Sequence, residues 1–126
     1  MSAIAISTMT QPLQKLFAAQ QANEEGASDL CLTFETAGND SAWVQVVSNT
    51  INFGYTGEDE PLYFLSQQGV DLLPDCAVIA WDKGLSATLT HTSQFGDDVA
   101  VFVDAILWSV HGLDDEFEIE VKAEQL

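Results

Sequence analysis

Basic residues are scarce in this sequence. Lysine and arginine together number 3, against 20 aspartate and glutamate residues, and the formal net charge at pH 7 is -17. A field of this sign repels the phosphates of nucleic acid and the headgroups of anionic membranes. We therefore expect no direct binding of nucleic acid and no membrane attachment.

Cysteine is also rare, and no long apolar run is present. Cys31 and Cys76 are the only cysteines and form no CxxC pair, and the opening residues lack the basic start of a secretion signal. We therefore expect reduced thiols rather than a disulfide, and a cytoplasmic location. No segment approaches the roughly 20 apolar residues that a membrane span requires.

Catalytic signatures are missing as well. The sequence has no GxSxG turn, no P-loop, no GxGxxG turn and no arginine that would stabilise an oxyanion. His91 and His111 form no HExxH motif or other paired spacing, and a lone histidine is more often structural. We expect neither an enzyme nor a bound metal or cofactor.

Hydrophobic residues are, by contrast, plentiful. They make up 47% of the 126 residues, and aromatic residues make up 10%, which is unlike a disordered acidic chain. This length and composition suit one domain with one core. We expect a flexible N-terminal arm over residues 1–9 and a single α+β domain over residues 10–126.

Helix signals begin at Thr10. This residue can cap a helix, and Pro12 fits the first turn, where its missing N–H is not needed. Leu13, Leu16 and Phe17 then form one apolar edge at helical spacing. The sequence therefore predicts an N-terminal helix that starts near Thr10.

Period-two alternation predicts several strands. The first three, at residues 30–35, 43–47 and 51–55, are separated by short turns and form an antiparallel meander. The unbroken apolar run at residues 76–81 is typical of a central strand. The turn WDKG then leads into another strand at residues 86–92.

Two more helices and a last strand complete the chain. Pro61 opens a short helix that Gly69 ends. A longer helix over residues 97–111 has apolar residues at helical spacing, and Gly112 caps its C-terminal end. A strand follows at residues 116–122. The predicted fold class is α+β, an antiparallel sheet of about five to six strands with an N-terminal helix, a short middle helix and a long C-terminal helix, followed by a terminal strand.

The last strand is strongly acidic. Its apolar residues Phe117, Ile119 and Val121 need a core, which directs the intervening glutamates outward and favours a solvated strand face. Such side chains project in a row and do not converge as metal ligands do. The acidic surface that we predict consists of Glu58, Asp59, Glu60, Asp114, Asp115, Glu116, Glu118 and Glu120.

The long helix carries a second apolar stripe. Val101, Ala105 and Trp108 lie at i, i+4 and i+7, on nearly the opposite face from the core stripe. Either the fold covers both faces, or the second stripe is a subunit or ligand interface, since exposed apolar stripes rimmed by charge mark binding surfaces. We predict such an interface, with Asp98 and Asp104 at its rim.

The order of these elements resembles that of the bacterial class I type III secretion chaperones and the YbjN-like proteins. The resemblance covers roughly residues 10–112 and is carried by the stretches PLQKLFAAQ, WVQVVSNTINFGY, EDEPLYFLSQQG, CAVIAWDKGLSATLTH and DDVAVFVDAILWSVHG. It implies a small acidic α+β protein, usually a homodimer, that binds another polypeptide and catalyses nothing. The N-terminal arm and the terminal strand EFEIEV depart from this pattern, and the strand can cover the surface that a chaperone offers its client.

We therefore expect a protein-binding module, chaperone-like or an adaptor, that forms a homodimer and binds a protein or peptide partner. Docking would use apolar side chains or an extended strand on a sheet edge, after the acidic field has attracted a basic partner. Trp43, Phe53 and Tyr55 are further contact candidates. The rival hypothesis is an inhibitor that mimics DNA. A mimic predicts carboxylates in two rows on one surface, whereas a chaperone predicts scattered charge around an apolar groove.

Overall fold

The computed structural model describes residues 3–26, 29–36, 39–113 and 117–125, and these residues form three helices and six strands. The helices are α1 (Ala3–Gln21), α2 (Pro61–Gln67) and α3 (Gly96–His111). The strands are β1 (Leu30–Thr36), β2 (Asn39–Val47), β3 (Thr50–Gly54), β4 (Ala77–Asp82), β5 (Ser86–Thr90) and β6 (Ile119–Gln125).

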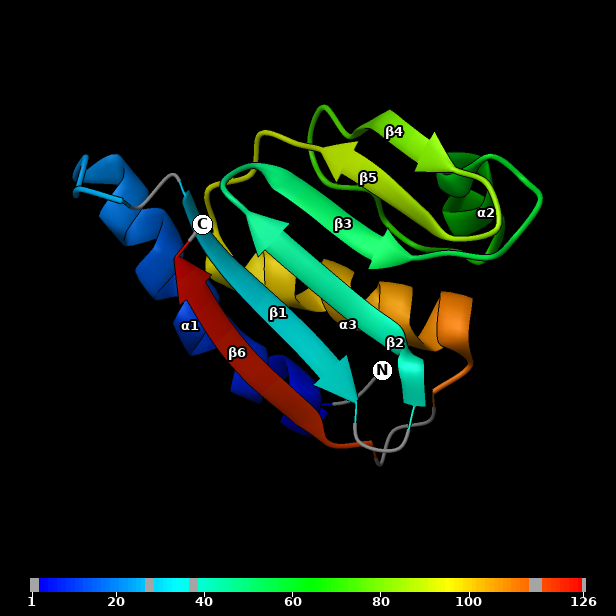
Figure 1. The fold of residues 1–126 in the computed structure, drawn as a ribbon, viewed down its shortest axis with the longest axis horizontal. Coiled ribbons are helices and arrows are strands. Elements are labelled where there is room, and N and C mark those ends of the chain that lie inside the picture. The colour runs from blue at the N-terminus through cyan, green and yellow to red at the C-terminus, as the bar shows by residue number, and fades with distance from the viewer. Residues whose placement is uncertain (1–2, 27–28, 37–38, 114–116, 126) are drawn as a thin grey trace.

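The strands form one antiparallel sheet in the order β4-β5-β3-β2-β1-β6. The two long helices, α1 and α3, lie behind this sheet in Figure 1, and no described helix covers the near face. The predicted α+β class, the element order and the meander of β1, β2 and β3 are confirmed.

The core lies between the sheet and the helix layer. Phe34, Val44 and Phe53 are cross-strand neighbours in one row, and each is fully buried. Phe102 and Ile106 of α3 belong to the same core cluster. Because side chains alternate along a strand, the next residue of each strand points to the side of the sheet that no helix covers.

The two long helices pack closely against each other. A Cβ atom at Gly96, the first residue of α3, would lie 2.5 Å from the backbone nitrogen of Gln14 in α1. Real Cβ atoms do not approach backbone so closely, so this contact requires glycine at position 96.

Helix α1 begins earlier than the sequence predicts. The expectation of a flexible arm is wrong over residues 3–9, because these residues are helical and Ala5 and Met9 are buried in the core. Pro12 consequently lies inside the helix, where its missing N–H costs a backbone hydrogen bond. Burial of Ala5, Met9 and Leu13, spaced four residues apart on one edge of the helix, offsets that loss.

Strand β4 lies at an edge of the sheet, so the prediction of a central strand at residues 76–81 is wrong. It pairs only with β5, and only Val78 and Trp81 of its side chains pack against the core. A short apolar run identifies a strand but does not reveal how many neighbours it has, which is the reason for this error.

The buried N-terminal turns make a prediction about stability. Met9→Ala should lower the free energy of unfolding by about 2 to 4 kcal/mol, because it leaves a cavity between α1 and the core. Urea denaturation measures this change. Ser7→Ala, at an exposed position of the same helix, is the control and should change stability by less than about 0.5 kcal/mol. Equal, small effects of both substitutions would contradict the early start of α1.

Candidate functional site

The second apolar stripe of α3 is mostly inaccessible to solvent. Ala105 and Asp104 are buried, with exposed fractions of 7% and 0%, and Trp108 is half-buried. Only Val101, which is 40% exposed, and the exposed Asp98 lie at the surface as expected. The prediction of a continuous exposed stripe with Asp104 at its rim is therefore wrong.

Helix α3 is covered because it has packing partners on several sides. It packs on the sheet through β2, along α1 and against α2, and the early start of α1 lengthens the contact between the two long helices. Val101 and Asp98 instead border a cavity of about 280 Å³ together with Leu72, which is 39% exposed. They remain surface residues, but they do not join Ala105 and Trp108 in one patch.

The three aromatic contact candidates are also separated. Phe53 and Tyr55 are buried, and the Tyr55 hydroxyl donates a hydrogen bond of 2.6 Å to the backbone oxygen of Asp59. Trp43 is half-buried, and it lines a cavity of about 280 Å³ together with His111. Of these three aromatic residues, only Trp43 is available to a partner.

The acidic loop before α2 has a structural role. Glu58, Asp59 and Glu60 are exposed, as expected. The Glu60 carboxylate accepts hydrogen bonds from the backbone N–H groups of Leu62, at 3.1 Å, and Tyr63, at 3.0 Å, and so caps α2. One carboxylate of the predicted acidic surface therefore stabilises the fold.

The predicted acidic clusters lie at opposite edges of the sheet. Residues 58–60 lead into α2, which packs on β4, whereas Glu120 lies in β6 and Glu118 directly precedes that strand. Strands spaced about 4.8 Å apart place the two edges of a six-stranded sheet about 24 Å from each other. Residues 114–116, the remaining members of the predicted surface, lie outside the described part of the chain. The described carboxylates thus form separate groups, which does not favour two rows on one surface.

The edge strand β4 is apolar but irregular. Ala77, Ile79 and Ala80 are exposed, Ile79 to 58%. The pairing with β5 shifts register between Val78 and Ala80, so Ile79 has no partner residue on β5. A bulge at a sheet edge interrupts the regular backbone ladder that an added strand would need. β4 therefore presents apolar side chains more readily than backbone hydrogen-bonding groups.

The opposite edge strand, β6, is regular. It pairs with β1 from Leu30↔Gln125 to Thr36↔Ile119 without a shift in register. Among the described residues, no strand pairs with its other side. A regular free edge of this kind offers backbone N–H and C=O groups to an extended polypeptide.

An apolar groove of about 540 Å³ lies between α1 and this edge of the sheet. Leu16 and Leu32, both buried, form its floor, and Val121 and Ala123 of β6 line one side. Ala123 is exposed although it shares the helix-facing side of β6 with Val121, so α1 leaves this end of the strand uncovered. The volume lies within the range of about 300 to 1,000 Å³ that is usual for ligand sites.

Two charged side chains also line this groove. Lys15 is an exposed residue of α1, and Glu24 follows the end of that helix. Lys15 is one of only 3 basic residues in the chain. It therefore places a positive charge beside an apolar surface of an otherwise acidic protein.

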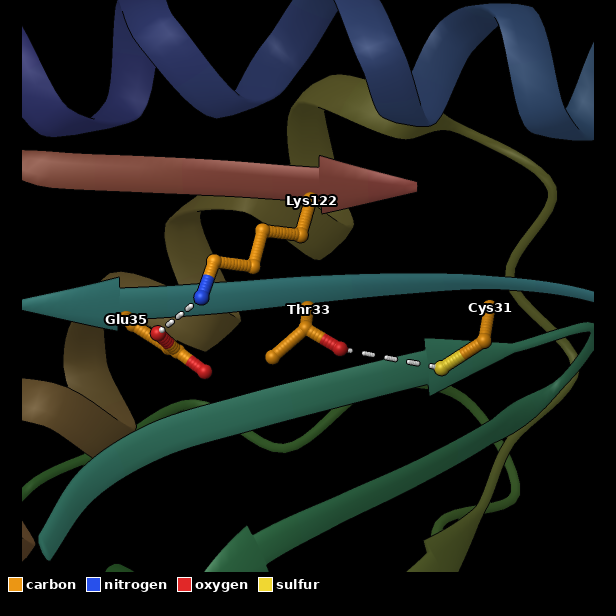
Figure 2. A network of polar contacts seen from close by, with 4 residues as sticks. All are labelled: Cys31, Thr33, Glu35 and Lys122. Atoms are coloured by element: carbon orange, nitrogen blue, oxygen red, sulfur yellow. Dashed lines mark hydrogen bonds and ion pairs between the residues drawn. The ribbon is translucent and has the colours of Figure 1, made fainter. Parts of the chain in front are cut away.

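The other face of β6 is charged (Figure 2). The Lys122 Nζ atom lies 3.1 Å from Glu35 Oε2, and this hydrogen bond raises the pKa of Lys122. Glu120 lies directly opposite Glu35, so Lys122 relieves a repulsion between like charges. Within the described chain, neither Glu120 nor Glu124 forms an ion pair of its own. Glu120 and Glu124 thus flank Lys122 on this face. Glu118 and Glu120 are exposed, as predicted for the acidic strand, but the strand runs over Ile119–Gln125 and not over residues 116–122.

Several core side chains that titrate are neutral at pH 7. Burial lowers the pKa of His91 to about 4 and also lowers the pKa of His111. Burial raises the pKa of the free Cys76 thiol to about 11, and the nearby charge of Glu60 adds to this effect. A thiol with so high a pKa forms almost no thiolate near neutral pH. The described residues contain no group of three or more His, Cys, Asp or Glu side chains placed to hold a metal ion.

None of the helices in the described ranges is long and apolar enough to cross a bilayer. Comparison of the chain with protein-family models, curated proteins and solved structures gave no match. The resemblance to secretion chaperones and YbjN-like proteins therefore stays a prediction from residue pattern.

The sequence does not predict the groove beside β6. Alternation places Ala123 and Val121 on the same side of the strand, and helical spacing places Lys15 near Leu16. Neither pattern indicates that α1 and the end of β6 diverge, because divergence depends on where α1 crosses α3. The two helices approach closely where Gly96 meets Gln14, a contact between segments that are far apart in the sequence.

The buried histidine makes a prediction about acid stability. His91 is 2% exposed and its Nδ1 accepts a hydrogen bond of 3.1 Å from the Ser93 N–H. Because its folded pKa is about 4 and the unfolded value is 6.5, the unfolded chain binds one more proton between these pH values. His91 should therefore contribute stability above pH 6.5 that is lost as the pH falls to 4, about 3 kcal/mol in total.

His91→Asn tests this effect, since the asparagine oxygen can still accept from Ser93 but does not titrate. The stability advantage of the wild type over this variant should shrink by about 3 kcal/mol between pH 7 and pH 4. Urea denaturation of both proteins at each pH gives the difference between their free energies of unfolding. The many carboxylates are common to both proteins, so their titration cancels in this difference. A difference that does not change with pH would contradict the prediction.

Proposed function

We propose that this protein is a non-catalytic polypeptide-binding module, chaperone-like or an adaptor, that accepts an extended segment of a partner protein beside β6. The observation that carries the proposal is the apolar groove of about 540 Å³ next to a regular, free sheet edge. An added strand obtains affinity from backbone hydrogen bonds and specificity from pockets that receive alternate side chains. The β6 edge offers both features together.

The geometry of β6 suits this mode of binding. Val121 and Ala123 face the groove, so the alternate side chains of a neighbouring strand on the same side of the sheet would also enter it. Burial of those side chains against Leu16, Leu30 and Leu32 would remove apolar surface from water. The terminal strand, which departs from the chaperone pattern, thus supplies the binding edge in this proposal.

The acidic field supports a protein partner over a nucleic acid. A net charge of -17 repels phosphates and raises the rate of encounter with basic segments. The DNA-mimic alternative receives no comparable support, since the described acidic clusters lie at opposite edges of the sheet.

Two variants, each with one alanine replaced by tryptophan, test the binding edge. Ala123→Trp should fill the groove and weaken binding of an alternating valine–threonine heptapeptide at least about tenfold, because the peptide loses its side-chain pocket. Ala18→Trp is the matched control, since Ala18 is also an exposed alanine but does not line the groove. It should leave binding unchanged.

The readout is a titration followed by amide chemical shifts in NMR spectra. Peptide binding should shift the amides of β6 and the facing turns of α1 and leave those of β4 in place. Shifts confined to β4, or equal loss of binding in both tryptophan variants, would contradict the proposal.

We propose in addition that the protein is a homodimer and that β4, rather than the α3 stripe, forms the contact between the two copies. Ile79 is 58% exposed, with the exposed Ala77 and Ala80 on either side, and Asp82 is the only carboxylate of this strand. An apolar strip on so acidic a protein supports self-association, since interface centres are depleted in charge.

Light scattering tests the dimer. The wild type should have the mass of two chains, and Ile79→Asp should be a folded monomer, because it places two buried carboxylates at the contact. Val101→Asp, at an exposed apolar position of α3, should remain a dimer. A monomeric wild type would contradict the homodimer. A monomeric Val101→Asp protein would indicate that the contact between the two copies lies on α3 and not on β4.

A further inference from the structure

We infer that the segment bound at β6 carries two basic residues four positions apart, with a neutral polar residue midway between them. Apolar residues occupy the positions on either side of each of these three residues. This inference rests on the proposed strand addition at β6 and specifies the chemistry of its partner. It follows from the different charges on the two faces of that strand.

The outer face of β6 determines where the basic residues lie. Glu120, Lys122 and Glu124 share this face by the alternation of β6. Lys122 already forms its ion pair with Glu35. A neighbouring strand places its side chains directly beside these three positions. Basic residues beside Glu120 and Glu124 complete two cross-strand ion pairs, whereas the position beside Lys122 favours a neutral side chain.

The groove face determines where the apolar residues lie. Val121, Ala123 and Leu32 line the groove, and Lys15 is the only basic residue that lines it. A basic side chain that entered here would lose water among apolar residues, and the charge of Lys15 would oppose the attraction of Glu24. The same residue is therefore favoured on the outer face and disfavoured in the groove.

The two faces together fix the register of the bound segment. A slip by one residue turns every side chain to the opposite face, so it would place basic residues against Lys15 and apolar residues in water. This penalty is a form of specificity against wrong registers. The pattern reads the same in both chain directions, so parallel and antiparallel strands satisfy it equally.

Four heptapeptides of defined pattern provide the probes. The first, Val-Lys-Val-Thr-Val-Lys-Val, has the inferred pattern, and Val-Val-Lys-Thr-Lys-Val-Val has the same composition with its lysines two positions apart, so no register places one beside Glu120 and the other beside Glu124. The third, Val-Thr-Val-Thr-Val-Thr-Val, is neutral, and the fourth, Val-Glu-Val-Thr-Val-Glu-Val, reverses the charge. Dissociation constants are measured at about 0.01 M and 0.15 M salt, because screening weakens exposed ion pairs.

The wild type should bind the first peptide roughly tenfold more tightly than the neutral peptide at low salt, and less selectively at the higher salt. It should bind the isomer of equal composition more weakly than the first peptide. Equal binding of the two lysine peptides would overturn the inference.

Two double variants separate the strand face from the overall field. Glu120→Lys/Glu124→Lys should reverse the preference, so that the glutamate peptide binds more tightly than the lysine peptide. Glu58→Lys/Asp59→Lys makes the same change in net charge at exposed positions near the opposite edge of the sheet, and it should keep the wild-type preference. Circular dichroism and urea denaturation establish that both variants are folded.

The outcomes distinguish this inference from the function on which it rests. If both double variants lose the preference equally, the overall field and not β6 selects the peptide, and the inference fails while binding at β6 stands. If no peptide, the neutral one included, shifts the β6 amides, then both the inference and the proposed function fail.

Discussion

Two long helices must cover a sheet of six strands, and this mismatch of widths underlies the rest of the structure. Strands about 4.8 Å apart place the axes of the two outermost strands about 24 Å from each other, whereas the axes of two packed helices lie only about 10 Å apart. Helix α1 packs on α3 so closely that the contact requires glycine at position 96, so the pair cannot spread to reach both edges. The short helix α2 lies near β4, and α1 stops short of the end of β6. Both free edges of the sheet therefore lie beyond full cover.

Local pattern predicts most of the elements, because each one buries residues at a recognisable spacing. The alternation of Phe34 with Thr33 and Glu35, and the left-handed Gly112 that caps α3, follow directly from residue type. The errors arise where packing between distant segments decides the outcome. Met9 and Asp104 are buried because α1 and α3 lie together, and no spacing within either helix indicates that contact. The groove beside β6 escapes prediction for the same reason, since it depends on where two helices cross.

The few basic residues of this protein occupy distinct environments. Lys122 offsets the repulsion between Glu35 and Glu120 where β6 joins β1, and Lys83 lies over the ring of Trp81, with its Nζ atom 5.7 Å from the centroid. Lys15 lines the apolar groove. In a chain of net charge -17, each of the 3 basic residues strongly changes the electrostatic potential around it. Most of the described acidic residues, in contrast, are exposed, and only some of them, such as Glu60, make specific contacts.

The pairing of β6 with β1 also has a consequence for the order of folding. The bond from the Gln125 side chain to the Gly26 carbonyl joins groups 99 residues apart, and the whole β1–β6 ladder spans a similar separation. Contacts between such distant residues form late, because the chain must lose the entropy of closing a long loop before these contacts stabilise it. The meander and the β4–β5 hairpin need only local closure, and the β3–β5 pairing that joins them spans a shorter separation than the β1–β6 pairing, so a five-stranded sheet precedes the complete one. During synthesis on the ribosome, the outer edge of β1 is therefore open to other strands until β6 has emerged and closed it.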